Sequence, residues 1–342
     1  MLSARLEDMV DLAIIGAGPI GLEAAIQAKR ASLRYVVLEK GCIANAIYHY
    51  PTYMTFFTTS ERLEIGGHPF VTATDKPTRK EALEYYRKVV HNEALDIKLY
   101  TQVTGIAKQA DGFRLETRDR SGEHRALNSK MVAMATGYFD NPKQLGIPGE
   151  EQAHVSHYYT EAHAFYGRKV TIIGAGSSAA DAALDLYRGG AEVTIVHRGE
   201  GFRHSLKYWI RPNLENRVKE GSIKAHFNTV AREITRGAVI VEKEGAVFEI
   251  PTEQTFLLTG YFASPELLKG AGVKLEPKTQ AAVLNPDTFE TDVDGLYVIG
   301  SAGSGTKTSD IFIENGLDHV QKAISAIVRK LQSKPVEVGA PT

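Results

Sequence analysis

The sequence predicts an α/β fold of two Rossmann-like domains, with the second domain inserted into the first. Residues 10–40 and 169–198 each have the pattern of a buried apolar strand, a glycine turn, an Ala-rich helix and a second strand. Two later apolar strands, at 131–138 and 255–261, both end in Thr-Gly-Tyr. A duplicated βαβ unit implies two dinucleotide-binding domains, and such chains cross between domains just after strands of this kind.

These crossings place the domain boundaries near residues 148 and 262. We expect a discontinuous first domain, residues 1–148 and 262–342, and a second domain of residues 149–261. Short apolar runs bounded by polar or glycine residues predict the remaining elements. We expect strands at 113–116, 131–135, near 238–249 and at 295–305, and a closing helix over 317–331.

Composition and charge exclude several partners. The 342 residues are 43% apolar and 24% charged, with a formal net charge of −1, the balance of a globular protein. Nothing in this charge indicates nucleic acid or an acidic membrane surface as a partner, and no uncharged apolar stretch approaches the length of a membrane span. The N-terminus has acidic residues before any long apolar run, so we expect neither a signal peptide nor a transit peptide.

The first glycine turn is Gly16-x-Gly18-x-x-Gly21, between a predicted strand and a predicted helix. In such a turn the first glycine permits the tight bend and the second leaves the backbone accessible to a pyrophosphate. The third lets the helix pack close to the strand. Glu39 follows at the end of the second strand, where an acid accepts hydrogen bonds from ribose hydroxyls. Together they predict a dinucleotide site.

The second glycine turn, at 174–179, repeats this arrangement with Ala in the third place, but the end of its second strand differs. His197 and Arg198 stand there, with Arg203 just beyond. An acid would repel a 2′-phosphate, whereas Arg pairs with it and His adds a donor or a positive charge. This site is therefore expected to prefer NADPH to NADH, and its expected residues are Gly174, Gly176, Ser177, Ser178, Ala179, His197, Arg198 and Arg203.

Two dinucleotide sites in one chain suggest a relay in which NADPH passes hydride to a flavin held by the first site. Residues 292–300 support a flavin, because they resemble the late strand of two-dinucleotide flavoproteins, which ends in Gly-Asp. Ser301 replaces that Asp, and its hydroxyl still makes a hydrogen bond. A helix starting after Gly316 is expected to point its N-terminus at the pyrimidine edge of the flavin and stabilise the reduced anion.

Two further groups of residues are possible site components. The segment 45–70 is rich in aromatics and Thr and lies soon after Glu39, so it is a candidate wall for the isoalloxazine, with ordinary packing as the alternative for any single ring. His154, His157 and His163 lack ligand spacing. We expect them to be surface or hydrogen-bonded residues and not a metal site.

Several further motifs are shared with one group of flavoproteins, and the block at 45–70 is the most specific of them. They are IIGAGPIG, EKG at 39–41, the block at 45–70, ATGYFDNP at 135–142, IPGE at 147–150, HVSHYY at 154–159, LTGY at 258–261 and IFIENG at 311–316. From about residue 10 to about 330, the chain resembles the thioredoxin-reductase-like flavoproteins, and most closely the YpdA-type bacillithiol disulfide reductases.

The resemblance implies an oxidoreductase with FAD and NADPH as cofactors, located in a bacterial cytoplasm as a homo-oligomer, a dimer or a tetramer. It implies a small-molecule disulfide or a small redox protein as electron acceptor, with no nucleic acid, membrane or metal. The group's late strand also lacks the Asp. The residues expected around FAD are Gly16, Gly18, Pro19, Gly21, Glu39, Lys40, Asn45, Gly137, Gly300, Ser301 and Gly316.

One departure from the group concerns its proposed redox cysteine, which falls between Pro19 and Gly21. This chain has Ile20 there, a candidate flavin-face residue that cannot form a mixed disulfide. Its one cysteine, Cys42, does not match that position and cannot form an internal disulfide, so we expect a packing role near the adenosine end. No catalytic residue is assigned. The acceptor stays open among a disulfide reacting directly with reduced flavin, a one-electron carrier, and another substrate.

The leading hypothesis is an NADPH-dependent reductase of the disulfide-reductase superfamily. A ferredoxin- or flavodoxin-type NADP reductase is the first alternative, because it needs no cysteine. A flavin monooxygenase is the second: residues 149–159 partly resemble its linker signature, although the leading Phe is absent and the Gly-to-His spacing is one residue longer. A redox sensor that binds both nucleotides is a non-enzymatic alternative, which steady NADPH turnover would argue against.

Overall fold

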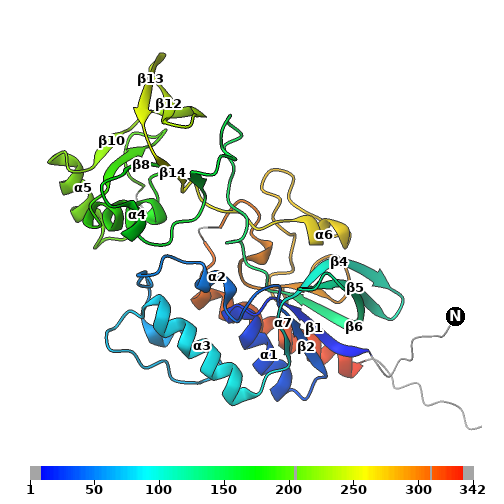
Figure 1. The fold of residues 1–342 in the computed structure, drawn as a ribbon. Helices are drawn as coiled ribbons and strands as arrows, with labels where there is room; N and C mark the ends of the chain where they lie inside the picture. The colour runs from blue at the N-terminus through cyan, green and yellow to red at the C-terminus, as the bar shows by residue number, and fades with distance from the viewer. Residues whose placement is uncertain (1–8, 204–205, 309, 334–342) are drawn as a thin grey trace, which may run out of the picture. The chain divides into compact units, whose positions relative to one another are not determined.

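The computed structural model describes residues 9–203, 206–308 and 310–333. The chain divides into two compact units, each with its own main sheet (Figure 1). The first unit contains the chain up to Tyr48, Thr58–Asn141 and the chain from Phe262 onward. The second contains His49–Phe57 and Pro142–Tyr261. The assignment of FAD to 1–148 and 262–342, and of NADPH to 149–261, stays a prediction.

The first unit is built on a sheet in the order β3-β2-β1-β6-β5-β4, with β15 also paired to β6. The strands β3, β2, β1, β6 and β15 pair in parallel, whereas β4, β5 and β6 form an antiparallel extension. The bounds are β1 (Val10–Ile15), β2 (Tyr35–Leu38), β3 (Ile97–Lys98), β4 (Thr101–Gln109), β5 (Gly112–Asp119), β6 (His124–Met134) and β15 (Leu296–Val298).

The helices of the first unit begin where the sequence supplies a start signal. Pro19 is the first residue of α1, and Thr78 caps α3 with Glu81 completing a capping box. Helices α1 and α7 lie side by side (Figure 1). The bounds are α1 (Pro19–Arg30), α2 (Asn45–Tyr48), α3 (Arg79–Glu93), α6 (Glu266–Gly270) and α7 (Ile313–Ser333), with 3-10 turns η2 (Ser60–Leu63) and η4 (Gly300–Gly303).

The second unit has a fully parallel sheet in the order β10-β9-β8-β14-β7 and a separate antiparallel sheet, β11-β12-β13. The strands are β7 (Val155–Ser156), β8 (Lys169–Ile173), β9 (Glu192–Val196), β10 (Lys224–His226), β11 (Val230–Ile234), β12 (Ala238–Lys243), β13 (Ala246–Pro251) and β14 (Gln254–Leu257). The helices are α4 (Ser177–Arg188) and α5 (Arg211–Lys219), with a 3-10 turn η3 (His163–Phe165).

Each unit has the layered core that the apolar patterns predict. Most residues of β1 and β8 are buried, and α1 and α4 each bury an alanine-rich face. Small side chains on these faces let a helix lie close to its strand. The predicted fold class, an α/β chain of two Rossmann-like units with the second inserted into the first, is confirmed. In the described part of the chain no helix is long and apolar enough to cross a membrane.

The start of α7 differs from the expectation that this helix begins after Gly316. It begins at Ile313, because Asn315 in the first turn accepts a hydrogen bond from the Phe312 N–H at 2.7 Å. Gly316 therefore lies inside the helix, where a Cβ would be 3.5 Å from the Cα of Gly300. The expected strand at 295–305 is also shorter, and β15 passes into η4.

Candidate dinucleotide sites

The first glycine turn, residues 16–21, is closed so tightly that two of its glycines have no room for a side chain. Gly16 has a φ of +108°, and a Cβ there would lie 2.6 Å from the carbonyl oxygen of Ala135. A Cβ on Gly21 would overlap the carbonyl oxygen of Gly16. These contacts hold the start of α1 against the ends of β1 and β6.

Gly18 faces open space, in contrast to its two neighbours in the motif. It is the N-cap of α1 with extended backbone, and a Cβ there would meet nothing within 4 Å. No side chain caps the helix, and its first turn contains no acidic residue. The free N–H groups at a helix start carry partial positive charge, so this turn fits a pyrophosphate.

Glu39 is a buried carboxylate, 6% exposed, at the end of β2. Its two oxygens accept hydrogen bonds from the N–H groups of Ala17 and Gly41, each at 2.7 Å. Burial raises the pKa of Glu39, and these two backbone hydrogen bonds act in the opposite direction. A carboxylate offers about four acceptor positions, so two remain for ribose hydroxyls. The residues of this turn therefore fit the adenosine half of FAD.

The polar residues that follow Glu39 have partners in the first unit. Lys40 forms an ion pair with Asp140 at 2.9 Å. The side-chain oxygen of Asn45 accepts from the N–H of Cys42 at 3.3 Å and lies 3.5 Å from its sulfur. Burial raises the pKa of the Cys42 thiol, which favours the protonated, weakly nucleophilic form.

Ile20 lies where the turn meets the late strand and the closing helix. A Cβ on Gly300 would be 3.1 Å from the Ile20 side chain, and a Cβ on Gly316 would be 2.8 Å from it. A Cβ on Gly137 would be 4.0 Å from the Ser301 hydroxyl. The structure therefore brings Ile20, Gly300 and Gly316 together and places Gly137 near Ser301, while contact of these residues with a flavin stays a prediction.

The second glycine turn, residues 174–179, has the same backbone design. Gly174 has a φ of +140°, and a Cβ there would overlap the carbonyl oxygen of Leu258. Gly176 is the extended N-cap of α4, with nothing within 4 Å of a Cβ, and no side chain caps the helix. Ser177 and Ser178 are the first residues of the helix, and Ala179, which follows them, is buried. This turn also fits a pyrophosphate.

Basic side chains gather at this second turn. Burial and the charges of Arg203 and Arg198 lower the pKa of His197, so the imidazole is neutral at pH 7. The backbone N–H of Arg203 donates to the Ala175 carbonyl at 3.3 Å, which holds Arg203 beside the turn. Across the described ranges, neither Arg198 nor Arg203 is ion-paired with a carboxylate. Exposed, unpaired cations here fit a 2′-phosphate.

Lys143, which sequence reasoning missed, lies within electrostatic reach of these arginines. Its pKa is lowered by burial and by the charges of Arg203 and Arg198. Its position in the sequence could have indicated it, because this lysine follows the first Thr-Gly-Tyr closely, where the chain enters the second unit.

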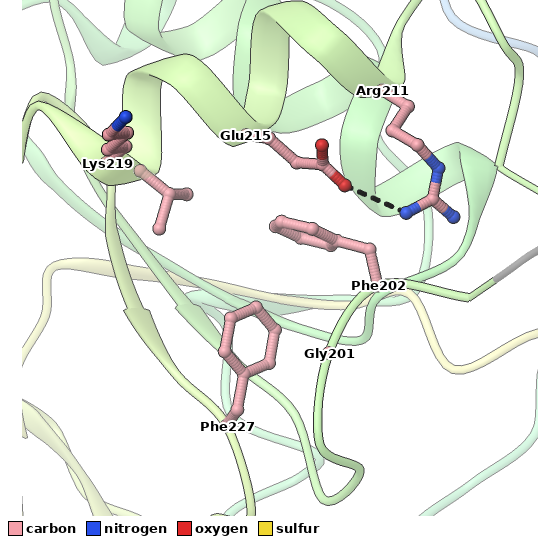
Figure 2. Close-up of a pocket in the computed structure, with 7 residues that line it drawn as sticks. Gly201, Phe202, Arg211, Glu215, Lys219 and Phe227 are labelled. Carbon is pink, nitrogen blue, oxygen red and sulfur yellow. Dashed lines mark hydrogen bonds and ion pairs between the residues drawn. The ribbon is translucent and has the colours of Figure 1, made fainter.

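A pocket of about 390 Å³ is lined by Gly201 and Phe202, which directly precede Arg203, and by residues of α5 (Figure 2). The rings of Phe202 and Phe227 meet edge-on with centroids 5.1 Å apart, and an ion pair of Arg211 with Glu215 closes one side. This packing supports the loop from the side of α5.

The aromatic segment 45–70 is divided between the two units. Residues 49–57 join the second unit, where the Thr52 N–H donates to the Thr160 carbonyl at 2.8 Å and Phe57 contacts Trp209. Phe70 packs in the first unit, stacked on Tyr85 at 4.2 Å. Contact of this segment with a flavin stays a prediction.

Two of the three clustered histidines contact an acceptor, and His163 is exposed. The His154 ring nitrogen lies 3.0 Å from the Thr235 carbonyl, and the His157 ring is 3.4 Å from the Glu150 carboxylate. In the parts of the chain that the structure describes, no three His, Cys, Asp or Glu side chains are grouped to hold a metal.

Comparison with known proteins identifies the family. The model for "Pyridine nucleotide-disulphide oxidoreductase" matches residues 13–300. The bacilliredoxin reductase Bdr of Bacillus subtilis is 38% identical over 308 residues, 90% of this chain and 94% of that protein. The chain belongs to the pyridine nucleotide-disulphide oxidoreductases. Within this family it is a thioredoxin-reductase-like flavoenzyme that uses FAD and NADPH, which confirms the predicted cofactors and the predicted resemblance.

Solved structures place this family member close to the YpdA group. The bacillithiol disulfide reductase Bdr (YpdA) of Bacillus cereus has a TM-score of 0.92 and 37% identity, covering 94% of this chain and 99% of that chain. The Staphylococcus aureus protein of the same name has a TM-score of 0.89 and 35% identity, with the same coverage. A ferredoxin–NADP reductase of Ignicoccus hospitalis is more distant, 28% identical over 85% of this chain and 90% of that protein.

Proposed function

We propose that this chain is an NADPH-dependent reductase of a bacillithiol-type disulfide, working without a protein thiol. The observation that carries the assignment is the pair of uncapped glycine turns, which are followed by side chains of opposite charge. One turn is followed by a buried carboxylate, Glu39, and the other by exposed cations, Arg198 and Arg203. Relatives with 35–37% identity are named for bacillithiol disulfide, which supports this substrate class.

In this proposal each turn holds one cofactor. The α1 turn and Glu39 bind the pyrophosphate and ribose of FAD, and the start of α7 stabilises negative charge on the flavin ring. The α4 turn binds the pyrophosphate of NADPH, with Arg198 on its 2′-phosphate. Bound flavin supplies the two-electron chemistry, and the protein supplies orientation and electrostatics. Glu39 acts as a ribose acceptor and takes no part in proton transfer.

The reaction balances without a cysteine in the chain. NADPH and one proton reduce one disulfide to two thiols, and the two electrons pass through the flavin. Ile20 offers no sulfur for a mixed disulfide, and the thiol of Cys42 is engaged with Asn45. We therefore infer that bound FAD would supply the electrons to the disulfide without a protein sulfur, with Ile20 as an inert aliphatic residue of the turn.

An acceptor screen tests this function. Enzyme reduced with NADPH under anaerobic conditions is mixed separately with bacillithiol disulfide, other small disulfides, a bacilliredoxin, ferredoxin, flavodoxin and quinones, with oxygen as a separate arm. Bacillithiol disulfide should reoxidise the flavin fastest and release two thiols per flavin. Reoxidation by every other acceptor but not by this disulfide would contradict the proposal.

A ferredoxin- or flavodoxin-type NADP reductase is the second candidate. Ile20 favours it, because one-electron transfer to a carrier needs no thiol at the flavin. Several relatives of 24–28% identity carry the name ferredoxin–NADP reductase. In the same screen this candidate requires rapid reoxidation by ferredoxin or flavodoxin and no thiol release.

We further infer a homo-oligomer, a dimer or a tetramer, in a bacterial cytoplasm, as in the sequence-based prediction. Light scattering on the FAD-loaded protein measures the number of subunits, and a monomer at micromolar concentration would contradict this inference.

A further inference from the structure

Backbone hydrogen bonds hold Lys143 at the carboxyl ends of the parallel strands of the second unit. Its N–H donates to the Gly260 carbonyl at 2.9 Å, and its carbonyl accepts from the Thr259 hydroxyl at 2.7 Å. Thr259 and Gly260 follow β14, which neighbours β8 on the side away from β9. Lys143 therefore lies on the β14 side of the second glycine turn, whereas Arg198 lies on the β9 side.

The ammonium group of Lys143 lies within electrostatic reach of the arginines at this turn. The same two charges, Arg203 and Arg198, lower the pKa of Lys143 and of His197, with Arg203 ahead of Arg198 in both cases. The backbone N–H of Arg203 donates to the Ala175 carbonyl, so Arg203 is held beside the turn itself. Like charges that converge on one place are stabilised by an anion.

We propose that Lys143 binds the pyrophosphate of the nicotinamide cofactor. The inference rests on the proposed function, because it takes residues 174–179 as the NADPH site. A dinucleotide crosses the carboxyl ends of the strands with its pyrophosphate at the helix N-terminus. With the 2′-phosphate at Arg198 beside β9, the pyrophosphate follows toward β14, where Lys143 is anchored.

This position gives Lys143 a role distinct from that of Arg198. NADPH and NADH share the pyrophosphate, so Lys143 strengthens the binding of both, while Arg198 selects NADPH. Lys143 also stands two residues after Asn141, the last residue of the first unit before the chain enters the second.

Calorimetric titration of the FAD-loaded enzyme with NADP+ and with NAD+ tests the proposal. Lys143→Met should weaken the binding of both nucleotides by the same factor, about tenfold or more, as expected for a charged hydrogen bond. Lys143→Arg keeps the charge and should stay within a few-fold of the wild type. Lys169→Met is the matched control. Lys169 is the first residue of β8, at the amino ends of the same strands, and its loss should change neither affinity.

Two results would overturn the proposal: unchanged affinities in Lys143→Met, or a loss confined to NADP+, which would put Lys143 on the 2′-phosphate. FAD content and the thermal midpoint of each variant report the fold. If Lys143→Met loses FAD, Lys143→Gln replaces it in the same titrations and is held to the same outcomes. A wild type that binds neither nucleotide would instead contradict the proposed function, so the two failures are distinguishable.

Discussion

The two glycine turns of this chain have nearly the same backbone, but the side chains after the following strand carry opposite charges. In both, the first glycine fits against a carbonyl of a neighbouring strand, and the second caps an otherwise uncapped helix and faces open space. The first turn ends at Glu39, buried and bonded to two backbone N–H groups, whereas the second ends at the exposed Arg198. In the proposed assignment, either backbone turn suits a pyrophosphate, and the residue after the second strand selects the nucleotide.

The largest expected effect comes from filling each cradle in turn. Gly18→Glu places a charged side chain in the pyrophosphate space of the first turn and should give protein without FAD. Gly176→Glu makes the same change in the second turn and should keep FAD while abolishing flavin reduction by NADPH. Visible absorbance and anaerobic reduction measure the two effects. Full FAD occupancy in Gly18→Glu would mean that the first turn is misassigned.

Replacing the acid of the first turn should weaken FAD binding without touching the second site. In Glu39→Gln the amide NH₂ faces one of the two buried backbone N–H groups, and one acceptor for the ribose is lost, so FAD affinity should fall by about tenfold or more. FAD affinity of the wild-type apoprotein should also fall with decreasing pH. The decline should begin above the ordinary Glu pKa, because burial raises the pKa of Glu39 and protonation removes the acceptor charge.

Equilibrium titration of apoprotein with FAD from pH 8 to pH 4.5 checks both expectations. A variant with unchanged FAD affinity, or a wild-type affinity independent of pH across this range, would contradict the role of Glu39 as the ribose acceptor.

Removing the cation of the second turn should change the choice of nucleotide. Arg198→Ala should raise the KM for NADPH by about 10- to 150-fold, from the loss of roughly 1.5–3 kcal/mol of charged hydrogen bonding, and leave the KM for NADH nearly unchanged. Steady-state kinetics with both nucleotides measures the difference. Equal changes for NADPH and NADH would show that Arg198 does not contact the 2′-phosphate.

The smallest expected effect concerns His197. Because burial and two arginines lower its pKa, the imidazole of the free enzyme is neutral at pH 7 and contributes no charge. His197→Gln retains a hydrogen-bond donor and should keep the NADPH KM within about twofold at pH 7.5, since a neutral hydrogen bond contributes only about 0.5–1.5 kcal/mol and is largely replaced. A tenfold rise in the NADPH KM alone would mean that His197 binds the 2′-phosphate as a cation.

Local sequence patterns predict part of the fold and of the candidate sites. The duplicated βαβ units, both turns and Glu39 could be predicted, because each depends on local patterns of glycine and apolar residues. The sequence predicts α7 to start after Gly316, three residues too late, because a glycine is typical of a helix boundary whereas Gly316 contacts Gly300 inside the helix. Lys143 and the segment 49–57 were missed as parts of the second unit, because only tertiary contacts associate them with it.

The central claim is that electrons reach a disulfide without a thiol of this chain. The most direct test is the anaerobic reoxidation of NADPH-reduced Cys42→Ser enzyme by bacillithiol disulfide, compared with the wild type. Cys42 sits beside Glu39 with its sulfur toward Asn45, so the variant should reoxidise at nearly the wild-type rate and release two thiols per flavin. Loss of reoxidation, with FAD content and the thermal midpoint intact, would contradict the account and require Cys42 in the relay.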